Sequence, residues 1–375
     1  MEGIGMSIMR AVGQAVDVLR LLPIGGPSCC NIAVTNVCNA TCDFCNYAKD
    51  KDFVTEKKWL DPERLNRALD ILHARGIRYI TFSGGEPMLH PKMCEMIAAV
   101  AYRGMRPAMV TNGSALTEKN MRDLADAGLK TLFISIDSPE AEKHEKNRGL
   151  PGVFAKIKQG NVLLRELGIK TVASCTINRL IGDDFEALFA SLDDLGFSTV
   201  TFTYPKKELN SGSLVFSSSS LIDFSDLELA DVLEILRSKK EKFGILNPSE
   251  SLSEMVRFLK KEKQQFECYG GYKYFALDVN FNIYRCDFWH APMGTIEEFQ
   301  HVEFVRDGCT KCMSVCYRDS SVFLNLPVAI GDAIGHTKRG RLDKAVKAMA
   351  QPSVRKSARS LMHEWKTLKR LARTS

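Results

Sequence analysis

The sequence has neither a long apolar run nor a usable secretion signal. Arg10, Asp17 and Arg20 interrupt the apolar stretches of the first 22 residues, which breaks up the apolar region that a signal peptide needs. Nothing later approaches the ~20 apolar residues of a membrane span. No internal repeat stands out beyond an alternation of strand-like and helix-like segments. A cytoplasmic protein of 375 residues, with one large α/β domain and a smaller appendage, is therefore expected.

The twelve cysteines cluster at ligand spacings in a large chain, so metal ligation in a reducing compartment explains them better than a disulfide framework. Cys38, Cys42 and Cys45 have the spacing C-x3-C-x2-C. Three such thiolates can bind three irons of a [4Fe–4S] cube and leave the fourth iron open to a substrate or cofactor. A zinc site is the alternative, but zinc sites usually pair two C-x-x-C hooks, and this loop has no obvious fourth ligand nearby.

Short β-rich runs alternate with helical patterns in the first part of the chain. Asp61 as N-cap with Pro62 after it, and Thr117 with Gly128 past the end, mark two of the helices. Six such units predict a parallel sheet with helices outside, and ligand sites at the carboxyl ends of its strands. The expected strands are Asn31–Thr35, Tyr79–Ser83, Ala108–Thr111, Thr131–Ile136, Thr171–Ile177 and Thr199–Tyr204.

Polar and glycine-rich segments follow these strands. The run Gly84-Gly85-Glu86-Pro87 comes after the second strand, where two glycines allow close backbone approach and a carboxylate can accept hydrogen bonds from an ammonium group. Asn112 follows the third strand, and Ser135 and Asp137 end the fourth. Such side chains can bind ribose hydroxyls or a carboxylate, and they can equally cap local turns.

The cysteine spacing, with Phe44 before the third cysteine, resembles the signature of the radical S-adenosylmethionine (SAM) enzymes over about residues 28–210. The resemblance implies a partial (β/α)6 barrel. In that family the open iron chelates the amino and carboxylate groups of SAM, and one electron cleaves it to a 5′-deoxyadenosyl radical, which abstracts hydrogen from a substrate or adds to it. A reductant such as flavodoxin or ferredoxin is an implied partner.

The same resemblance assigns the remaining cofactor positions. Gly84, Gly85, Glu86 and Pro87 look like the segment that holds the SAM amino group, and Asn112, Ser135 and Asp137 match further contact positions. Arg148 suits the SAM carboxylate by a bidentate fork, or is a solvated loop arginine. Phe44 is expected near the adenine, and Asn178 and Tyr204 are candidates for the same pocket. The catalytic acid, base or hydrogen donor stays unknown.

A second group of cysteines lies beyond the barrel. Residues 275–285 predict a hairpin with Asn in its turn, which would bring Cys268 and Cys286 toward one another, and Cys309-x2-Cys312-x3-Cys316 adds another thiolate hook. The layout resembles the Twitch or abbreviated SPASM domain, with Phe281 where the hairpin usually has glycine. It implies one auxiliary [4Fe–4S] cluster closed by protein ligands, with one of the five cysteines spare; structural zinc is the alternative.

The net charge of +6 is unevenly distributed along the chain. From residue 336 onward there are twelve Lys and Arg residues but only two acidic residues, Asp343 and Glu364. Leu361, Trp365, Leu368 and Leu371 form an apolar stripe there, so the tail predicts either a peripheral membrane helix or a helix packed on the protein. Only 37 residues precede Cys38, which are too few for the leader-binding domain that radical SAM enzymes acting on ribosomal peptides often carry. A lipid or isoprenoid substrate is therefore preferred. A peptide or protein maturase and a small-molecule dehydrogenase are the alternatives.

The expected organisation is α/β, a partial barrel with a small C-terminal iron–sulfur domain and a helical basic tail. Two interpretations lie outside this class: a non-catalytic iron–sulfur electron carrier, and a nucleic-acid-binding protein that uses the tail, although no nucleic acid is expected because the body of the chain is not basic. The expected boundaries are 1–27 for an N-terminal amphipathic helix, 28–210 for the barrel, 211–265 for a linker and helices, 266–320 for the auxiliary-cluster domain and 321–375 for the tail.

Overall fold

The structure, a computed structural model, describes residues 24–50, 54–182, 184–205, 218–240, 242–286, 289 and 291–365. These fall into two compact units, here called the barrel unit (27–225 and 269–307) and the helical unit (up to 26, 226–268 and 308–375). The expected helix of residues 1–27 lies almost wholly outside the described residues.

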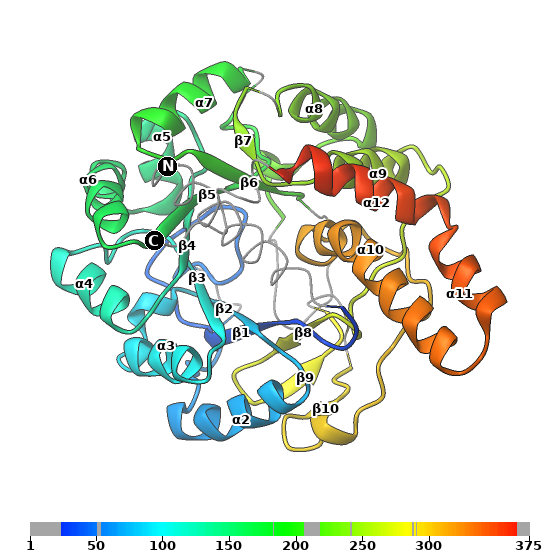
Figure 1. The fold of residues 1–375 in the computed structure, drawn as a ribbon. Coiled ribbons are helices and arrows are strands. Elements are labelled where there is room, and N and C mark those ends of the chain that lie inside the picture. The colour runs from blue at the N-terminus through cyan, green and yellow to red at the C-terminus, as the bar shows by residue number, and fades with distance from the viewer. Residues whose placement is uncertain are drawn as a thin grey trace, which may run out of the picture. The chain divides into compact units, whose positions relative to one another are not determined.

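The barrel unit is built on six parallel strands that are neighbours in chain order, as the sequence predicts (Figure 1). Each boundary lies within two residues of its expected position. Alternate side chains such as Ile32, Phe82 and Ile134 are fully buried, which is the period of a pleated strand. The strands are β1 Cys29–Thr35, β2 Tyr79–Gly84, β3 Arg106–Thr111, β4 Thr131–Ser135, β5 Lys170–Thr176 and β6 Thr199–Thr203.

Helices connect these strands and lie outside them (Figure 1). The predicted N-caps are confirmed, because the side chain of Asp61 accepts from Glu63 N at 3.0 Å and that of Thr117 accepts from Asn120 N at 3.2 Å. The fold is thus the predicted partial (β/α)6 barrel. The helices are α2 Pro62–Ala74, α3 Met93–Tyr102, α4 Glu118–Asp126, α5 Ala141–Arg148, α6 Val153–Glu166 and α7 Phe185–Asp194, with short 3-10 turns at Pro87–Leu89, Ser220–Ile222 and Phe299–His301.

The predicted hairpin extends the sheet beyond β1. β8 (Tyr274–Leu277) runs parallel to β1, β9 (Asn282–Tyr284) is antiparallel to β8, and β10 (Gly294–Thr295) is antiparallel to β9. The left-handed turn residue is Phe281, with φ of 67°, where an L-residue costs on the order of 1 kcal/mol. Burial of its ring, with the Arg64 guanidinium 4.5 Å from the ring centre, offsets this strain.

The helical unit contains α8 (Asp226–Ser238), the short β7 (Gly244–Ile245), α9 (Ser249–Leu259) and then α10 (Val315–Lys338), α11 (Leu342–Met349) and α12 (Pro352–His363). None of the helices in the described ranges is long and apolar enough to span a membrane.

The α10 helix contains Pro327, which removes a backbone donor and crowds the preceding turn. Next to it, the hydroxyl of Ser357 from α12 donates to Val322 O at 2.6 Å and accepts from Leu326 N at 3.1 Å. These are the two groups that an uninterrupted helix joins directly, so the hydroxyl is inserted into the helical hydrogen-bond ladder. Leu361, the first residue of the predicted membrane stripe, is buried, whereas Leu368 and Leu371 lie outside the described residues.

A buried polar cluster joins elements of the helical unit. Lys240 Nζ donates to Ile245 O at 2.9 Å and lies 3.1 Å from Glu364 Oε2. The Asp319 carboxylate accepts from Asn247 Nδ2 at 2.8 Å and from the Ser251 hydroxyl. Burial raises the pKa of Asp319 to about 7.

Asp319→Asn should make this protein more stable at high pH. The folded pKa of about 7 lies above the ordinary value of 3.8, so the folded protein holds this proton over a pH range in which the unfolded chain has released it. The contribution of Asp319 to the free energy of unfolding is therefore fully present below pH 3.8 and is lost as the pH rises through about 7. The difference corresponds to a free energy of unfolding on the order of 4 kcal/mol. Urea unfolding at pH 5 and pH 8 should show a smaller pH dependence in Asp319→Asn than in wild type. Exposed Asp343→Asn is the control, and equal pH dependence in all three proteins would refute the expectation.

Candidate functional site

The cysteine loop follows β1 at the carboxyl edge of the parallel strands. The end of β2 holds this loop through its backbone, since Gly85 N donates to Thr35 O and Glu86 N donates to Val37 O, both at 2.8 Å. A Cβ at Gly84 would lie 2.2 Å from Thr35 O, and one at Gly85 would lie 2.1 Å from Val37 O. Only glycine therefore allows the two segments to approach so closely.

The loop itself is a compact turn. Cys45 N donates to Cys42 O at 3.1 Å, and Ala40 N donates to Cys38 Sγ at 3.5 Å. Phe44 is buried beside them. Burial raises the pKa of Cys38 to about 11 and that of Cys42 to about 12, so metal binding at neutral pH must release protons from these thiols.

The three thiols suit an iron–sulfur cube better than a single ion. In the ranges that the structure describes, no three His, Cys, Asp or Glu side chains are arranged around one metal ion. A cube needs no such arrangement, because each thiolate binds a different iron. The donor chemistry, three thiols and no carboxylate or imidazole, fits a [4Fe–4S] cluster.

Glu86 is a buried hub between the β2 and β3 loops. Its Oε1 accepts from Met88 N at 3.0 Å and from Thr111 Oγ1 at 2.8 Å, and its Oε2 accepts from Asn112 N at 2.7 Å. Burial raises the pKa of this carboxyl, although the hydrogen bonds from Asn112 and Met88 oppose that rise. Three of its roughly four acceptor positions are thus filled by the protein.

Asn112 ties the third strand to the cysteine loop. Its Nδ2 donates to Asn39 Oδ1 at 2.8 Å, and its Oδ1 accepts from Ser114 N at 2.9 Å. Asn39 Nδ2 in turn donates to Ser114 Oγ at 2.9 Å. The amide of Asn112 therefore fixes the loop between the first two cysteines.

Asp137 and Arg148 form a buried ion pair at the end of β4. Arg148 Nη2 lies 2.7 Å from Asp137 Oδ1, with side chains 9% and 0% exposed. Burial alone would raise the pKa of Asp137, but Arg148 outweighs it and the pKa is lowered. Burial likewise would lower the pKa of Arg148, whereas Asp137 raises it. Both groups are therefore charged over the whole physiological range.

The end of α5, which carries Arg148, contacts the cysteine loop. Arg148 O accepts from Thr41 N at 2.8 Å, and Asn147 Oδ1 accepts from Asp43 N at 3.2 Å. A Cβ at Gly149 would lie 2.3 Å from Thr41 Oγ1. Arg148 Nε is buried without a hydrogen-bond partner in the protein. The loop thus has a fixed cation behind it and a free buried donor, which suit an anionic cluster or carboxylate.

The other predicted cofactor residues are placed as follows. Asn178 is buried, and its Nδ2 donates to Asp137 O at 3.0 Å and to Thr176 O at 2.8 Å. Pro87 begins the turn after Glu86, Tyr204 is buried just past β6, and Ser135 is half-buried at the end of β4. All lie at the carboxyl ends of the strands, and their contacts with a cofactor stay predictions.

His144 is a residue that the sequence reasoning missed. Its Nδ1 accepts from Asp137 N at 3.1 Å, and burial lowers its pKa to about 4, so the ring is neutral at pH 7. Asn39 and Asn147 were also missed. His144 lies four residues before Arg148, and this spacing places both on one face of α5. This four-residue spacing from Arg148 is the feature of the sequence that could have identified His144.

The second cysteine group is divided between the units. Cys268, Cys309, Cys312 and Cys316 belong to the helical unit, where Cys268 N donates to Cys309 O at 2.9 Å. Cys286 belongs to the barrel unit, and its carbonyl accepts from Trp289 N at 3.2 Å. Two cysteine-bearing segments of the helical unit therefore meet through their backbones.

Comparisons with known proteins agree with this geometry. Residues 32–195 match the Radical SAM superfamily. An AdoMet-dependent heme synthase of Oleidesulfovibrio alaskensis is 31% identical over 191 residues, which cover 50% of this chain and 48% of that protein. The match thus spans about half the length of that curated relative.

Solved structures share the fold. The histidine-tagged form of anSMEcpe with bound AdoMet has a TM-score of 0.58 and 15% identity, covering 93% of this chain and 100% of that one. Streptococcus suis SuiB bound to its precursor peptide SuiA has a TM-score of 0.57 and 12% identity, covering 86% and 77%. The cysteine loop, the strand order and the match over residues 32–195 converge on one conclusion: the barrel unit of this chain carries a segment that matches the radical SAM superfamily.

Proposed function

We propose that this enzyme reductively cleaves SAM at a [4Fe–4S] cluster held by Cys38, Cys42 and Cys45. When bound, the reduced cluster supplies the electron that breaks the carbon–sulfur bond of SAM. The observation that carries the proposal is the cysteine loop, clasped at the carboxyl edge of six parallel strands by Gly84 and Gly85. The protein's part is to fix the loop, bind SAM and exclude water.

The surrounding residues have distinct roles in this proposal. Glu86 has one acceptor position left for the SAM ammonium group, and Arg148 has one buried donor left for an anion. Asp137 keeps Arg148 charged and in place, and the buried Phe44 is proposed to pack near the adenine of SAM. Gly85, Pro87, Asn112, Ser135, Asn178 and Tyr204 complete the proposed SAM pocket. A flavodoxin or ferredoxin is the proposed electron donor.

A second [4Fe–4S] cluster is part of the proposal. Cys268, Cys309 and Cys312 are the preferred ligands in the helical unit, and the contact between Cys268 N and Cys309 O supports their convergence. Cys316 is exposed and is the last choice. The place of Cys286 in this ligand set stays a prediction from the sequence.

Iron analysis tests the second cluster. Anaerobically reconstituted wild-type protein should contain about eight irons per chain, and Cys309→Ala should contain about four, because one cube loses a ligand. Cys94→Ala is a matched control, since this half-buried cysteine of α3 is outside both groups, and it should keep about eight. About four irons with one zinc in the wild type would contradict the proposal.

Three classes of molecule are candidate substrates of the radical. The curated relative is named for heme and SuiB was solved with a peptide, so their names point to different substrates. The lipid or isoprenoid hypothesis rests on the tail, and Leu361 of its stripe is buried in the helical unit. Peripheral membrane association likewise stays a prediction. Incubating the reduced protein with SAM and a lipid extract, a porphyrin or a peptide library, followed by mass spectrometry of the products, discriminates between these classes.

A further inference from the structure

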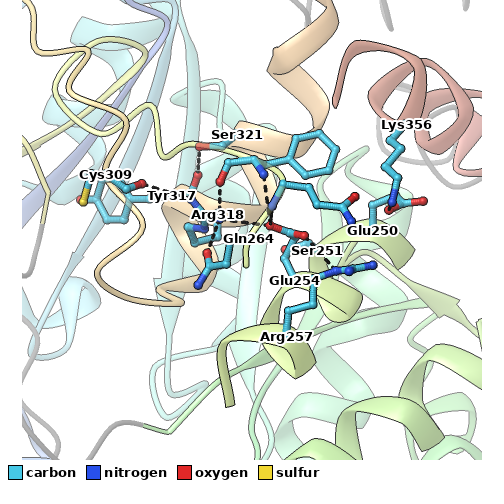
Figure 2. Close-up of polar contacts among 12 residues, drawn as sticks. Glu250, Ser251, Glu254, Arg257, Gln264, Cys309, Tyr317, Arg318, Ser321 and Lys356 are labelled. Atoms are coloured by element: carbon cyan, nitrogen blue, oxygen red, sulfur yellow. Dashed lines mark hydrogen bonds and ion pairs between the residues drawn. The ribbon is translucent and has the colours of Figure 1, made fainter. Parts of the chain in front are cut away.

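The two cysteine segments of the helical unit share a buried support. Arg318 lies in the first turns of α10, two residues after Cys316, and is only 2% exposed. An arginine so fully buried must have its charge and most of its five donors satisfied by the protein. Figure 2 shows its side chain among Glu254, Gln264 and the backbone of Cys309.

The guanidinium of Arg318 holds both segments at once. Its Nη2 donates to Phe266 O and to Gln264 Oε1, each at 2.7 Å, which fixes the chain just before Cys268. Its Nη1 donates to Cys309 O at 3.5 Å, a long bond to the same carbonyl that accepts from Cys268 N. One rigid, planar group therefore spans from the residue two before Cys268 to Cys309.

Glu254 of α9 completes the support from the other side. Its Oε2 accepts from Gln265 N at 2.7 Å and from Phe266 N at 3.1 Å, and it lies 3.7 Å from Arg318 Nη2. The carboxylate thus balances the buried charge and clamps the same short segment through its backbone donors. Both side chains of the pair are 2% exposed, so water does not screen the pair.

One hydrogen-bond donor of Arg318 is not used by the protein. Its Nε is buried and has no hydrogen-bond partner in the protein. This donor is available to an acceptor that the protein itself does not supply, such as a thiolate or sulfide of a cluster. The residues present thus fit a cluster held by this unit's cysteines.

We infer that Arg318, seated by Glu254, is a positioning residue that sets the spacing of Cys268 and Cys309 for the auxiliary cluster. The inference rests on the proposed second cluster. Residues that orient metal ligands typically change metal affinity by about 10- to 100-fold when they are replaced. A residue needed only for folding would alter the stability of the apoprotein instead.

A matched pair of variants tests this inference. Arg318→Lys keeps the charge but loses the planar fork that spans three acceptors. Arg257→Lys is the control, because Arg257 Nε lies 3.3 Å from Oε1 of the same Glu254 but belongs to α9, one turn further along that helix. Reconstituted proteins are exposed anaerobically to an iron chelator, and iron release is followed together with the electron paramagnetic resonance signals of both clusters.

The expected result is a second cluster that loses iron about tenfold faster in Arg318→Lys than in wild type or Arg257→Lys. The SAM cluster serves as the internal reference and should be unaffected, and the fall in the urea midpoint of the Arg318→Lys apoprotein should be too small to account for the tenfold faster release. Equal release rates in all three proteins, or a faster loss matched by an equally destabilised apoprotein, would overturn the inference. A wild type with only about four irons would instead remove the second cluster itself, and the inference with it.

Discussion

Replacing Cys38, Cys42 and Cys45 together by Ala should abolish formation of 5′-deoxyadenosine from SAM. The triple variant removes every protein ligand of the proposed SAM cluster, and no other thiol lies on that loop. Iron content should fall from about eight to about four per chain, because the proposed second cluster is assigned to other cysteines. Chromatography of the reaction products and iron analysis on the same samples measure both effects.

Two results separate the possible outcomes of this experiment. Cys29→Ala together with Cys94→Ala and Cys175→Ala is a matched control, with three cysteines removed outside the loop, and it should retain SAM cleavage. Persistent cleavage in the loop variant would show that the central assignment is wrong.

Replacing Asp137 by Ala should cost the barrel unit roughly 3–5 kcal/mol of unfolding free energy. The change leaves Arg148 charged and buried with no carboxylate. Because Arg148 O and Asn147 Oδ1 hold the backbone of the cysteine loop, iron incorporation at the SAM cluster should fall as well. Urea unfolding and iron analysis measure the two effects.

Asp194→Ala is the matched control for this prediction. Asp194 pairs with Lys158 at 2.6 Å in the same unit, but the side chains are 65% and 53% exposed. Such surface pairs contribute about 0–1 kcal/mol, so this variant should be nearly as stable as wild type. Equal losses in the two variants would mean that burial does not set the energy of the Asp137 pair.

Much of the barrel was predictable because its signals are local. The β-rich runs marked all six parallel strands, and Asp61 and Thr117 marked helix starts through capping, which involves residues two or three positions apart. The site's general location followed from a topological rule, since the loops after parallel strands converge at one edge. The match over residues 32–195 supports the family that the cysteine spacing suggested.

The partners within the site could not be predicted, because they depend on contacts distant in sequence. Asp137 and Arg148 each resembled a ligand group, and nothing in the sequence shows that they bind one another.

The packing of the tail could not be predicted either. A 3.6-residue period marks the apolar face of a helix but not what covers it, and Leu361 proves to be packed inside the helical unit. Phe281 shows a further limit, because a left-handed residue is expected to be Gly or Asn.

The most direct test of the central claim is SAM cleavage by the wild-type protein. Reconstituted protein is reduced anaerobically in the presence of SAM, and 5′-deoxyadenosine and methionine are quantified by mass spectrometry. We expect both products, in amounts above those from the Cys38, Cys42 and Cys45 triple variant. Protein that carries its full complement of about eight irons and still releases no 5′-deoxyadenosine would contradict the claim.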